Sequence, residues 1–292
     1  MGGQPGELPT VLIGNLFYKG MPEVSNHKQG SFDKELVSRW IEIAEAFSVE
    51  SGVPHLLDIM AMYPMAISKY IEYVCDRTDD VFLVDGANLE TRIAALETAE
   101  RLGLGERIIY NGITPRTSKE ELIAIQDSGI KSAVVMAFND LDYSPEGRVS
   151  ILKGSGEELG LIDASRKARI EKILVDTVVF DIPSISHAAE AIKLVKEALG
   201  YPAGCSPANA TYSWKELCKD RLMLTDAFVA ANVSAHTIAQ SWGADFLIYG
   251  PIKQARNMIA ACAINDAIIA YRAKKRFGIK PISKVHPLYK IF

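Results

Sequence analysis

The sequence predicts one domain of the (β/α)8 class, a closed TIM barrel that spans residues 1–292. Short apolar runs of strand length alternate with stretches of helical periodicity along the whole chain. Strict alternation implies a parallel sheet with right-handed crossovers. Eight such units over about 250 residues have the size of a closed barrel. We find no linker or low-complexity tract that would separate a second domain.

The strands are predicted from runs of apolar residues that end at Gly, Asn, Asp or Pro. "VFLV" at 81–84 contains four apolar residues without alternation, which is typical of a strand covered on both faces. The predicted strands are 10–17, 55–60, 81–86, 107–112, 132–139, 177–182, 203–207 and 244–250.

The helices are predicted from periodicity and from residues that favour helix ends. Ser118 and Glu121 form a capping-box pattern, Pro64 suits a first turn, and Gly129 and Gly200 suit helix ends. The predicted helices are 33–50, 64–76, 89–102, 118–128, 165–175, 187–199, 214–241 (in one or two pieces) and 254–276.

An open doubly wound sheet is the main alternative fold. It usually carries a glycine-rich phosphate loop after its first strand, and "IGNLFYKG" lacks the G-x-G-x-x-G pattern.

The predicted barrel contains a long connection at 140–164 between the fifth strand and its helix. A connection of that length in a compact domain is more often a lid or binding loop than filler.

Composition and charge exclude several classes of function. The net charge of −4 argues against nucleic acid or an anionic membrane as the main partner. "MGGQPGELPT" has neither the basic start nor the apolar segment of a signal peptide, and no apolar run approaches the roughly 20 residues of a membrane span. We therefore expect a cytoplasmic protein.

The four cysteines lie far apart without a C-x-x-C, so free thiols and no bound metal are expected.

Polar residues end several of the predicted strands. Asp58 in "HLLDIM", Asp85 in "VFLVDG", Asn111 in "RIIYNG" and Asp181 in "TVVFDI" each follow an apolar run. One such residue alone is often a helix cap or turn residue. In a barrel, however, all of them would meet at the C-terminal face, where active sites lie. We therefore predict a binding site that contains all four.

This set of side chains suits a planar ligand with N–H groups along one edge. A carboxylate accepts two parallel N–H bonds, and an asparagine amide complements a carbonyl. The 2-amino-pyrimidinone edge of a reduced pterin has this pattern.

Four segments of the chain resemble a known family. "GGQPGELPTVLIG", "FLVDGANLETRIAAL", "VVFDIPSI" and "PISKVHPLYKIF" resemble the MtrH family, named for a subunit of the methanogens' tetrahydromethanopterin S-methyltransferase. The resemblance spans nearly the whole chain. Within this family the chain most resembles the soluble bacterial relatives that transfer a methyl group between a corrinoid protein and tetrahydrofolate. The family implies a (β/α)8 fold, a homodimer, and a pterin on the top face of the barrel.

The order Asp, Asn, Asp, Asn at successive strand ends is more distantly similar to methyltetrahydrofolate:corrinoid methyltransferases. Through that resemblance Asp85, Asn111 and Asp181 match pterin-binding residues. Asn209 matches the Asn that reaches pterin N5, which makes it the expected catalytic residue. The distant family has Gly-Leu-Ser-Asn, whereas "GCSPAN" inserts two residues, so Ser206 or Asn232 could take that place.

The resemblance implies a methyltransferase that moves a methyl group between methylcob(III)alamin, carried by a partner corrinoid protein, and the co-substrate tetrahydrofolate. Demethylation that forms 5-methyltetrahydrofolate is the expected direction. Alternatives are a tetrahydromethanopterin-specific subunit, a thiol-directed or methylamine-type methyltransferase, and a non-catalytic subunit that only docks a corrinoid protein.

The last helix is apolar nearly all round, so we expect it to be partly buried in a homodimer.

Overall fold

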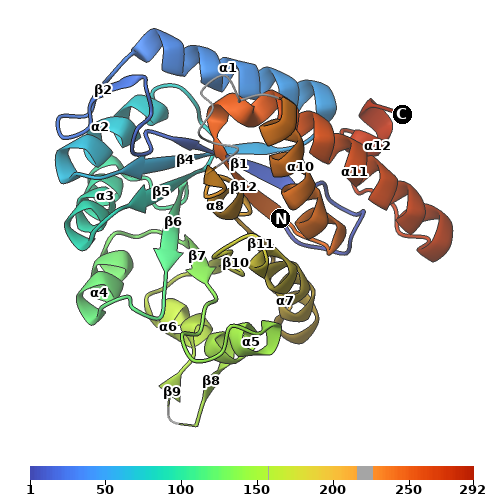
Figure 1. Cartoon of the computed structure of the whole chain (residues 1–292). Helices are drawn as coiled ribbons and strands as arrows, with labels where there is room; N and C mark the ends of the chain where they lie inside the picture. The colour runs from blue at the N-terminus through green and yellow to red at the C-terminus, as the bar shows by residue number, and fades with distance from the viewer. Residues whose placement is uncertain (157, 216–225) are drawn as a thin grey trace.

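The computed structural model shows a closed barrel of eight parallel strands, which confirms the predicted fold class (Figure 1). It describes residues 1–156, 158–215 and 226–292. Around the barrel the strands follow the order β1 (Val11–Leu16), β12 (Phe246–Pro251), β11 (Ala203–Cys205), β10 (Lys172–Asp176), β7 (Ser132–Met136), β6 (Ile108–Ile113), β5 (Phe82–Gly86) and β4 (His55–Ala61).

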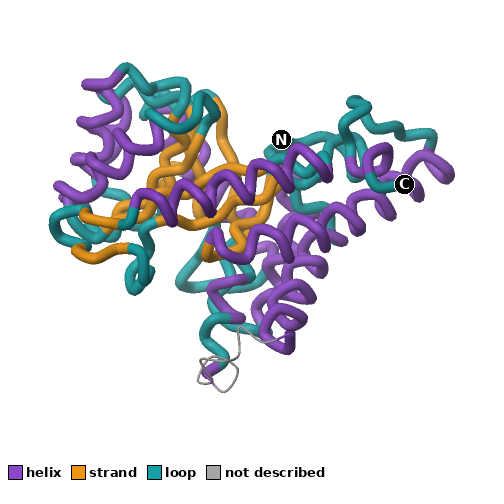
Figure 2. The backbone as a smooth tube through the Cα atoms, turned by 90° about the horizontal axis from the view of Figure 1, so that it is seen from above, coloured by secondary structure: helices purple, strands orange, loops and turns teal. Residues whose placement is uncertain are grey.

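Helices surround the strands, which lie together near the centre of the molecule (Figure 2). The helices that follow the strands are α1 (Lys34–Ser51), α2 (Pro64–Cys75), α3 (Leu89–Leu102), α4 (Lys119–Asp127), α5 (Pro145–Lys153), α6 (Leu161–Lys167), α7 (Ser184–Leu199), α10 (Asp226–Ser241) and α11 (Ala255–Phe277). Shorter elements are β2 (Val24–Asn26), β3 (Ser31–Phe32), β8 (Gly154–Ser155), β9 (Glu158–Leu159), α8 (Ala208–Thr211), η1 (Ile252–Gln254) and α12 (Pro287–Lys290).

The helix ends follow the signals in the sequence. The hydroxyl of Ser118 accepts the backbone N–H of Glu121 at 3.1 Å and caps α4, as the capping pattern predicts. Pro64 occupies the first turn of α2. Gly200 ends α7 with a φ of 72°, a left-handed conformation that glycine adopts without steric cost.

The inside of the barrel is packed with apolar side chains, and this packing supports the polar strand ends above it. A buried cluster draws on strands all around the barrel. Its members are Val11, Ile13, Leu83, Ile109, Val134, Leu174, Phe246 and Ile248, with Leu56 packed against them.

The sixth barrel strand is where the sequence prediction is wrong. The periodicity predicts a helix at 165–175 and a strand at 177–182, whereas β10 covers Lys172–Asp176. Ile170, Ile173 and Leu174 have the i, i+3, i+4 spacing of a helix, so this short apolar run is ambiguous. Its pairing with β7, which starts at Lys172↔Ser132, gives the segment an extended conformation.

The described residues of the long connection at 140–164 include regular structure. They form α5, the antiparallel strands β8 and β9, and the start of α6. Of the helix predicted at 214–241, residues 226–241 form α10, and residues 216–225 lie outside the described residues. Within the part of the chain that the structure describes, no helix is long and apolar enough to cross a membrane.

Candidate functional site

A polar cavity of about 350 Å³ opens at the carboxyl ends of the barrel strands. Its position follows from the two-residue period of a strand, which returns every second side chain to the barrel interior. Two residues beyond an interior apolar side chain, the next inward-facing residue reaches the top of the barrel. The pairs that obey this rule are Ile13 and Asn15, Leu56 and Asp58, Leu83 and Asp85, Ile109 and Asn111, Val134 and Met136, and Leu174 and Asp176.

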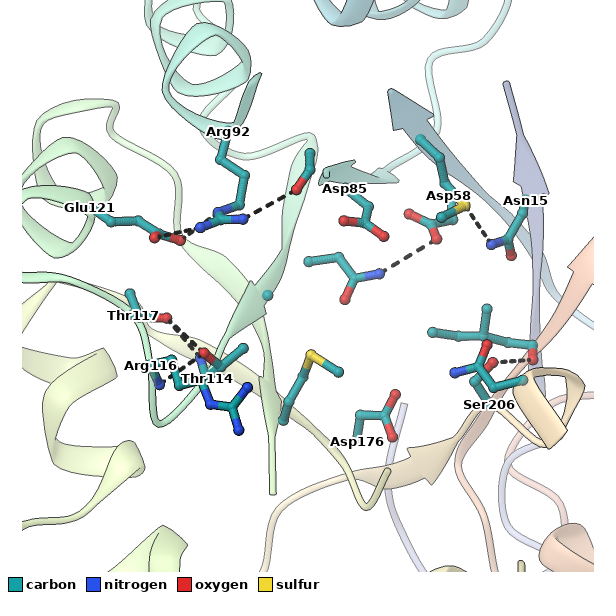
Figure 3. A pocket seen from close by; sticks show the side chains of 17 residues that line it. Asn15, Asp58, Asp85, Arg92, Thr114, Arg116, Thr117, Glu121, Asp176 and Ser206 are labelled. Atoms are coloured by element: carbon teal, nitrogen blue, oxygen red, sulfur yellow. Dashed lines mark hydrogen bonds and ion pairs between the residues drawn. The ribbon is translucent and has the colours of Figure 1, made fainter. Parts of the chain in front are cut away.

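The structure therefore brings together three of the four predicted strand-end residues, Asp58, Asp85 and Asn111. Asp58 is 1% exposed, and Asn111 donates its Nδ2–H to Asp58 Oδ2 at 3.4 Å (Figure 3). Oδ1 of Asp58 is buried and has no hydrogen-bond partner among the described residues. Burial and the nearby Asp85 carboxylate raise the pKa of Asp58 well above its usual value, while the Asn111 bond opposes this shift.

Asp85 lies next to a buried polar network that the sequence did not reveal. Arg92 binds Glu121 through Nε–Oε1 at 2.9 Å and Nη2–Oε2 at 3.0 Å (Figure 3). Arg92 Nη1 also donates to the carbonyl of Gly86 at 3.3 Å, and the Tyr110 hydroxyl donates to Glu121. Burial raises the pKa of Asp85 to about 6, and the positive charge of Arg92 opposes that rise.

The acid at the sixth strand end is Asp176, not Asp181. Asp176 is 4% exposed and lines the cavity, and its Oδ1 accepts the Val178 backbone N–H at 2.7 Å. Burial raises its pKa to about 6, opposed by the Val178 bond and by the positive charge of Arg148.

Asp181 is exposed in the loop before α7 and does not line the cavity. Its Oδ1 accepts the Ser184 N–H at 2.8 Å, which is a turn contact at the start of that helix. Our placement of Asp181 at a strand end is therefore wrong, because "TVVF" forms the loop after β10. A signal for Asp176 existed, since "ILVD" at 173–176 repeats the pattern of "FLVD" at 82–85.

Asn209 lines the same cavity despite the two-residue insertion before it. It is exposed and lies in α8, which directly follows Pro207. Ser206 also lines the cavity, and its hydroxyl donates to the Ile248 carbonyl at 3.2 Å. Asn232 is buried outside the cavity lining, where it accepts a hydrogen bond from Thr211 at 2.7 Å. Asn209 is thus better placed than Asn232 to contact a bound ligand.

One side of the cavity mouth carries a cation. Arg116 lines the cavity and pairs with Asp140 at 2.8 Å, and its guanidinium lies 5.5 Å from the centre of the Phe138 ring. The floor is therefore acidic and amide-rich, whereas a basic side chain lies at the rim. Within residues 1–156, 158–215 and 226–292, no cluster of three or more His, Cys, Asp or Glu could hold a metal ion.

Solved structures support the fold. The chain is similar to dihydropteroate synthase from Xanthomonas albilineans, with a TM-score of 0.61, 19% identity, and coverage of 90% of this chain and 93% of that one. The synthase from Yersinia pestis gives a TM-score of 0.58 at 15% identity, with 89% and 93% coverage. At these identities the likeness concerns the barrel architecture.

Sequence relatives are more informative. The H subunit of tetrahydromethanopterin S-methyltransferase from Methanothermobacter marburgensis is 35% identical over 296 residues, which cover 100% of this chain and 94% of the relative. The corresponding protein of Methanopyrus kandleri is 35% identical, with 98% and 93% coverage. The H subunit of a putative methyltransferase, mtx, from Methanosarcina barkeri is 32% identical, with 99% and 93% coverage. The family model of the tetrahydromethanopterin S-methyltransferase MtrH subunit matches residues 1–282, and the chain belongs to this methyltransferase family.

Proposed function

We propose that this chain transfers a methyl group between a corrinoid protein and a reduced pterin that binds in the strand-end cavity. The observation that carries the proposal is the convergence of Asp85, Asn111 and Asp176 on one cavity in a chain of this family. Two carboxylates and an amide suit the N–H groups and the carbonyl of an amino-pyrimidinone ring.

Each side chain then has a distinct task. Asp176 and Asp85 accept N–H groups of the pterin, and Asn111 fixes the orientation of the ring. Asn209 lies near N5, the atom that gains or loses the methyl group. A side-chain amide can donate to N5 or accept from N5–H, so it can stabilise the charge that changes there in either direction of transfer. Holding two large reactants in line supplies much of the remaining rate enhancement.

The identity of the pterin is proposed from the relatives rather than from the cavity. The relatives are named for tetrahydromethanopterin, and they lend no support to tetrahydrofolate. We therefore propose tetrahydromethanopterin as the first candidate and tetrahydrofolate as the second. The residues considered above contact the ring system, which both compounds share.

Titration calorimetry with both pterins tests this proposal. We expect one of them to bind with a stoichiometry of one per chain. Binding of tetrahydrofolate alone would support the co-substrate predicted from the sequence. Failure to bind either pterin would contradict the proposal and favour a subunit that only docks a corrinoid protein.

The partners follow from the same proposal. The corrinoid protein brings the cobalt to the open mouth of the cavity, and the enzyme works in the cytoplasm.

We also propose a homodimer, because α11 presents Ile264, Ile268 and Tyr271 to solvent, with Ile264 58% and Ile268 61% exposed. Large apolar side chains that recur every three to four residues on one helix face are typical of a helix–helix contact.

A further inference from the structure

We propose that Asp58 and Asp85 hold one proton between them at neutral pH. In this arrangement Asp58 offers an O–H donor to the bound ligand, and Asp85 beside it offers a carboxylate acceptor. The proposal rests on the proposed function, because it defines which atoms of a pterin this part of the cavity would recognise. A tetrahydropterin has the complementary pair in its ring nitrogen N1, an acceptor, next to N8–H, a donor.

The first argument is the position of the two carboxyl groups. They come from neighbouring strands, β4 and β5, which pair in parallel with Asp58 opposite Leu83 and Met60 opposite Asp85. Both side chains point into the same corner of the cavity, next to each other (Figure 3). Asp58 is buried and Asp85 is partly buried. Two carboxylates that share such a site resist ionisation of both, because like charges repel strongly where little water separates them.

The second argument decides which carboxyl keeps the proton. Asp85 has a cation beside it in Arg92, whereas the hydrogen-bond partner of Asp58 is the neutral amide of Asn111. Arg92 is fixed in place by its bidentate bond to Glu121 and by the Gly86 carbonyl. Arg92 also packs closely against the backbone of Gly86, where an added Cβ would lie 2.6 Å from Arg92 Cγ. The negative charge therefore lies on Asp85.

The third argument assigns the proton to one oxygen. Oδ2 of Asp58 already accepts the Asn111 N–H, so the proton belongs on Oδ1. Oδ1 is buried and has no partner in the described parts of the chain. Buried O–H groups are almost always hydrogen-bonded. We therefore infer that the O–H on Oδ1 of Asp58 donates to an acceptor atom of a ligand bound in the cavity.

Other charged groups near the pair are consistent with this assignment. Glu121 is paired with Arg92 and accepts the Tyr110 hydroxyl. Across the cavity, Asp176 has Arg148 behind it, and at the rim Arg116 is paired with Asp140. Burial raises the pKa of both carboxyl groups of the pair, the charge of Asp85 adds to the rise at Asp58, and Arg92 opposes the rise at Asp85.

The direct test needs no ligand, so it is independent of the proposed function. Carboxyl 13C NMR of aspartate-labelled free enzyme would follow the ionisation of each group, with Asp58→Asn and Asp85→Asn used to assign the signals. We expect the Asp58 signal to keep the shift of a protonated carboxyl from pH 5 to 8 while Asp85 ionises. Two ionised carboxylates at pH 7, or the reverse order, would overturn the proposal.

A binding test then addresses the donor role, with calorimetric titrations of tetrahydromethanopterin and tetrahydrofolate. Asp58→Ala removes one neutral hydrogen bond and should weaken pterin binding by about three- to tenfold. Asp58→Asn should retain most of the wild-type affinity, because its amide is also a donor. In the wild-type enzyme affinity should fall at alkaline pH as Asp58 loses its proton, and Asp58→Asn should lack this fall. Equal loss of affinity in both Asp58 variants would overturn the donor role, and Asp181→Asn serves as the control outside the cavity.

Discussion

Replacement of Asp176 by Asn tests the corrected assignment of the sixth strand end. The substitution keeps the shape of the side chain and removes its charge. One oxygen accepts the Val178 N–H, and the group lines the cavity at 4% exposure, so little water can replace the lost interactions. Hydrogen bonds to a charged group contribute roughly 1.5–3 kcal/mol, which corresponds to about a 10- to 150-fold loss of pterin affinity.

The matched control is Asp181→Asn, because this acid is exposed and lies outside the cavity lining. We expect its dissociation constant to equal that of the wild-type enzyme within twofold, with a loss of stability of about 1 kcal/mol or less from the weakened contact to Ser184. Calorimetric titration of the three proteins with the same pterin is the assay. Tight binding by Asp176→Asn and weak binding by Asp181→Asn would refute our reasoning.

Asp176→Asn also affects the fold, and this effect must be measured separately. Arg148 is fully buried, and its Nε and Nη1 have no hydrogen-bond partner in the described ranges. The nearby negative charge of Asp176 favours the charged form of this guanidinium, so its removal should lower the unfolding temperature. If Asp176→Asn does not fold, Asp176→Glu, which keeps the charge but displaces the carboxylate, replaces it in the titration and should still bind more weakly than the wild type.

Three further predictions concern catalysis, stability and assembly. Asn209→Ala should lower the single-turnover rate of methyl transfer by about 10²-fold and change pterin affinity far less, because the proposed hydrogen bond between the Asn209 amide and N5 strengthens in the transition state. A wild-type rate in this variant would exclude the catalytic role of Asn209. Burial raises the pKa of Asp266 to about 7 despite two bonds from Thr10, so the folded chain holds a proton that the unfolded chain releases. The free energy of unfolding, measured in urea, should therefore fall as pH rises from about 4 to 7, and less so in Asp266→Asn; equal slopes would contradict this. In light scattering, Ile264→Asp with Ile268→Asp should convert a dimer to a monomer of 32.0 kDa, and a monomeric wild type would contradict the homodimer.

The barrel could be predicted because the composition of the strands, the periodicity of the helices and their strict alternation all indicated the same fold. Apolar runs such as "VFLV" at 81–84 have the composition of a strand covered on both faces, and β5 occupies Phe82–Gly86. Asp58, Asp85 and Asn111 could be placed together because parallel strands in a barrel all end at one face. The same logic placed the sixth acid wrongly, since Ile170, Ile173 and Leu174 fit a helix as well as a strand.

The network around Asp85 could not be predicted from sequence. Glu121 fits a capping box, in which its side chain would bond to the start of its own helix. In the structure its backbone N–H is capped by Ser118, but its carboxylate binds Arg92 of another helix. Contacts between residues 29 positions apart depend on how α3 and α4 pack together, which periodicity along one segment does not describe.

The most direct test of the central claim is a crystal structure of the chain with the reduced pterin that binds most tightly in calorimetry. We predict that the amino-pyrimidinone edge lies within hydrogen-bond distance of Asp176 and Asn111, with N5 facing Asn209. A pterin bound outside the cavity, or one inside it that leaves both Asp176 and Asn111 without contact, would contradict the account.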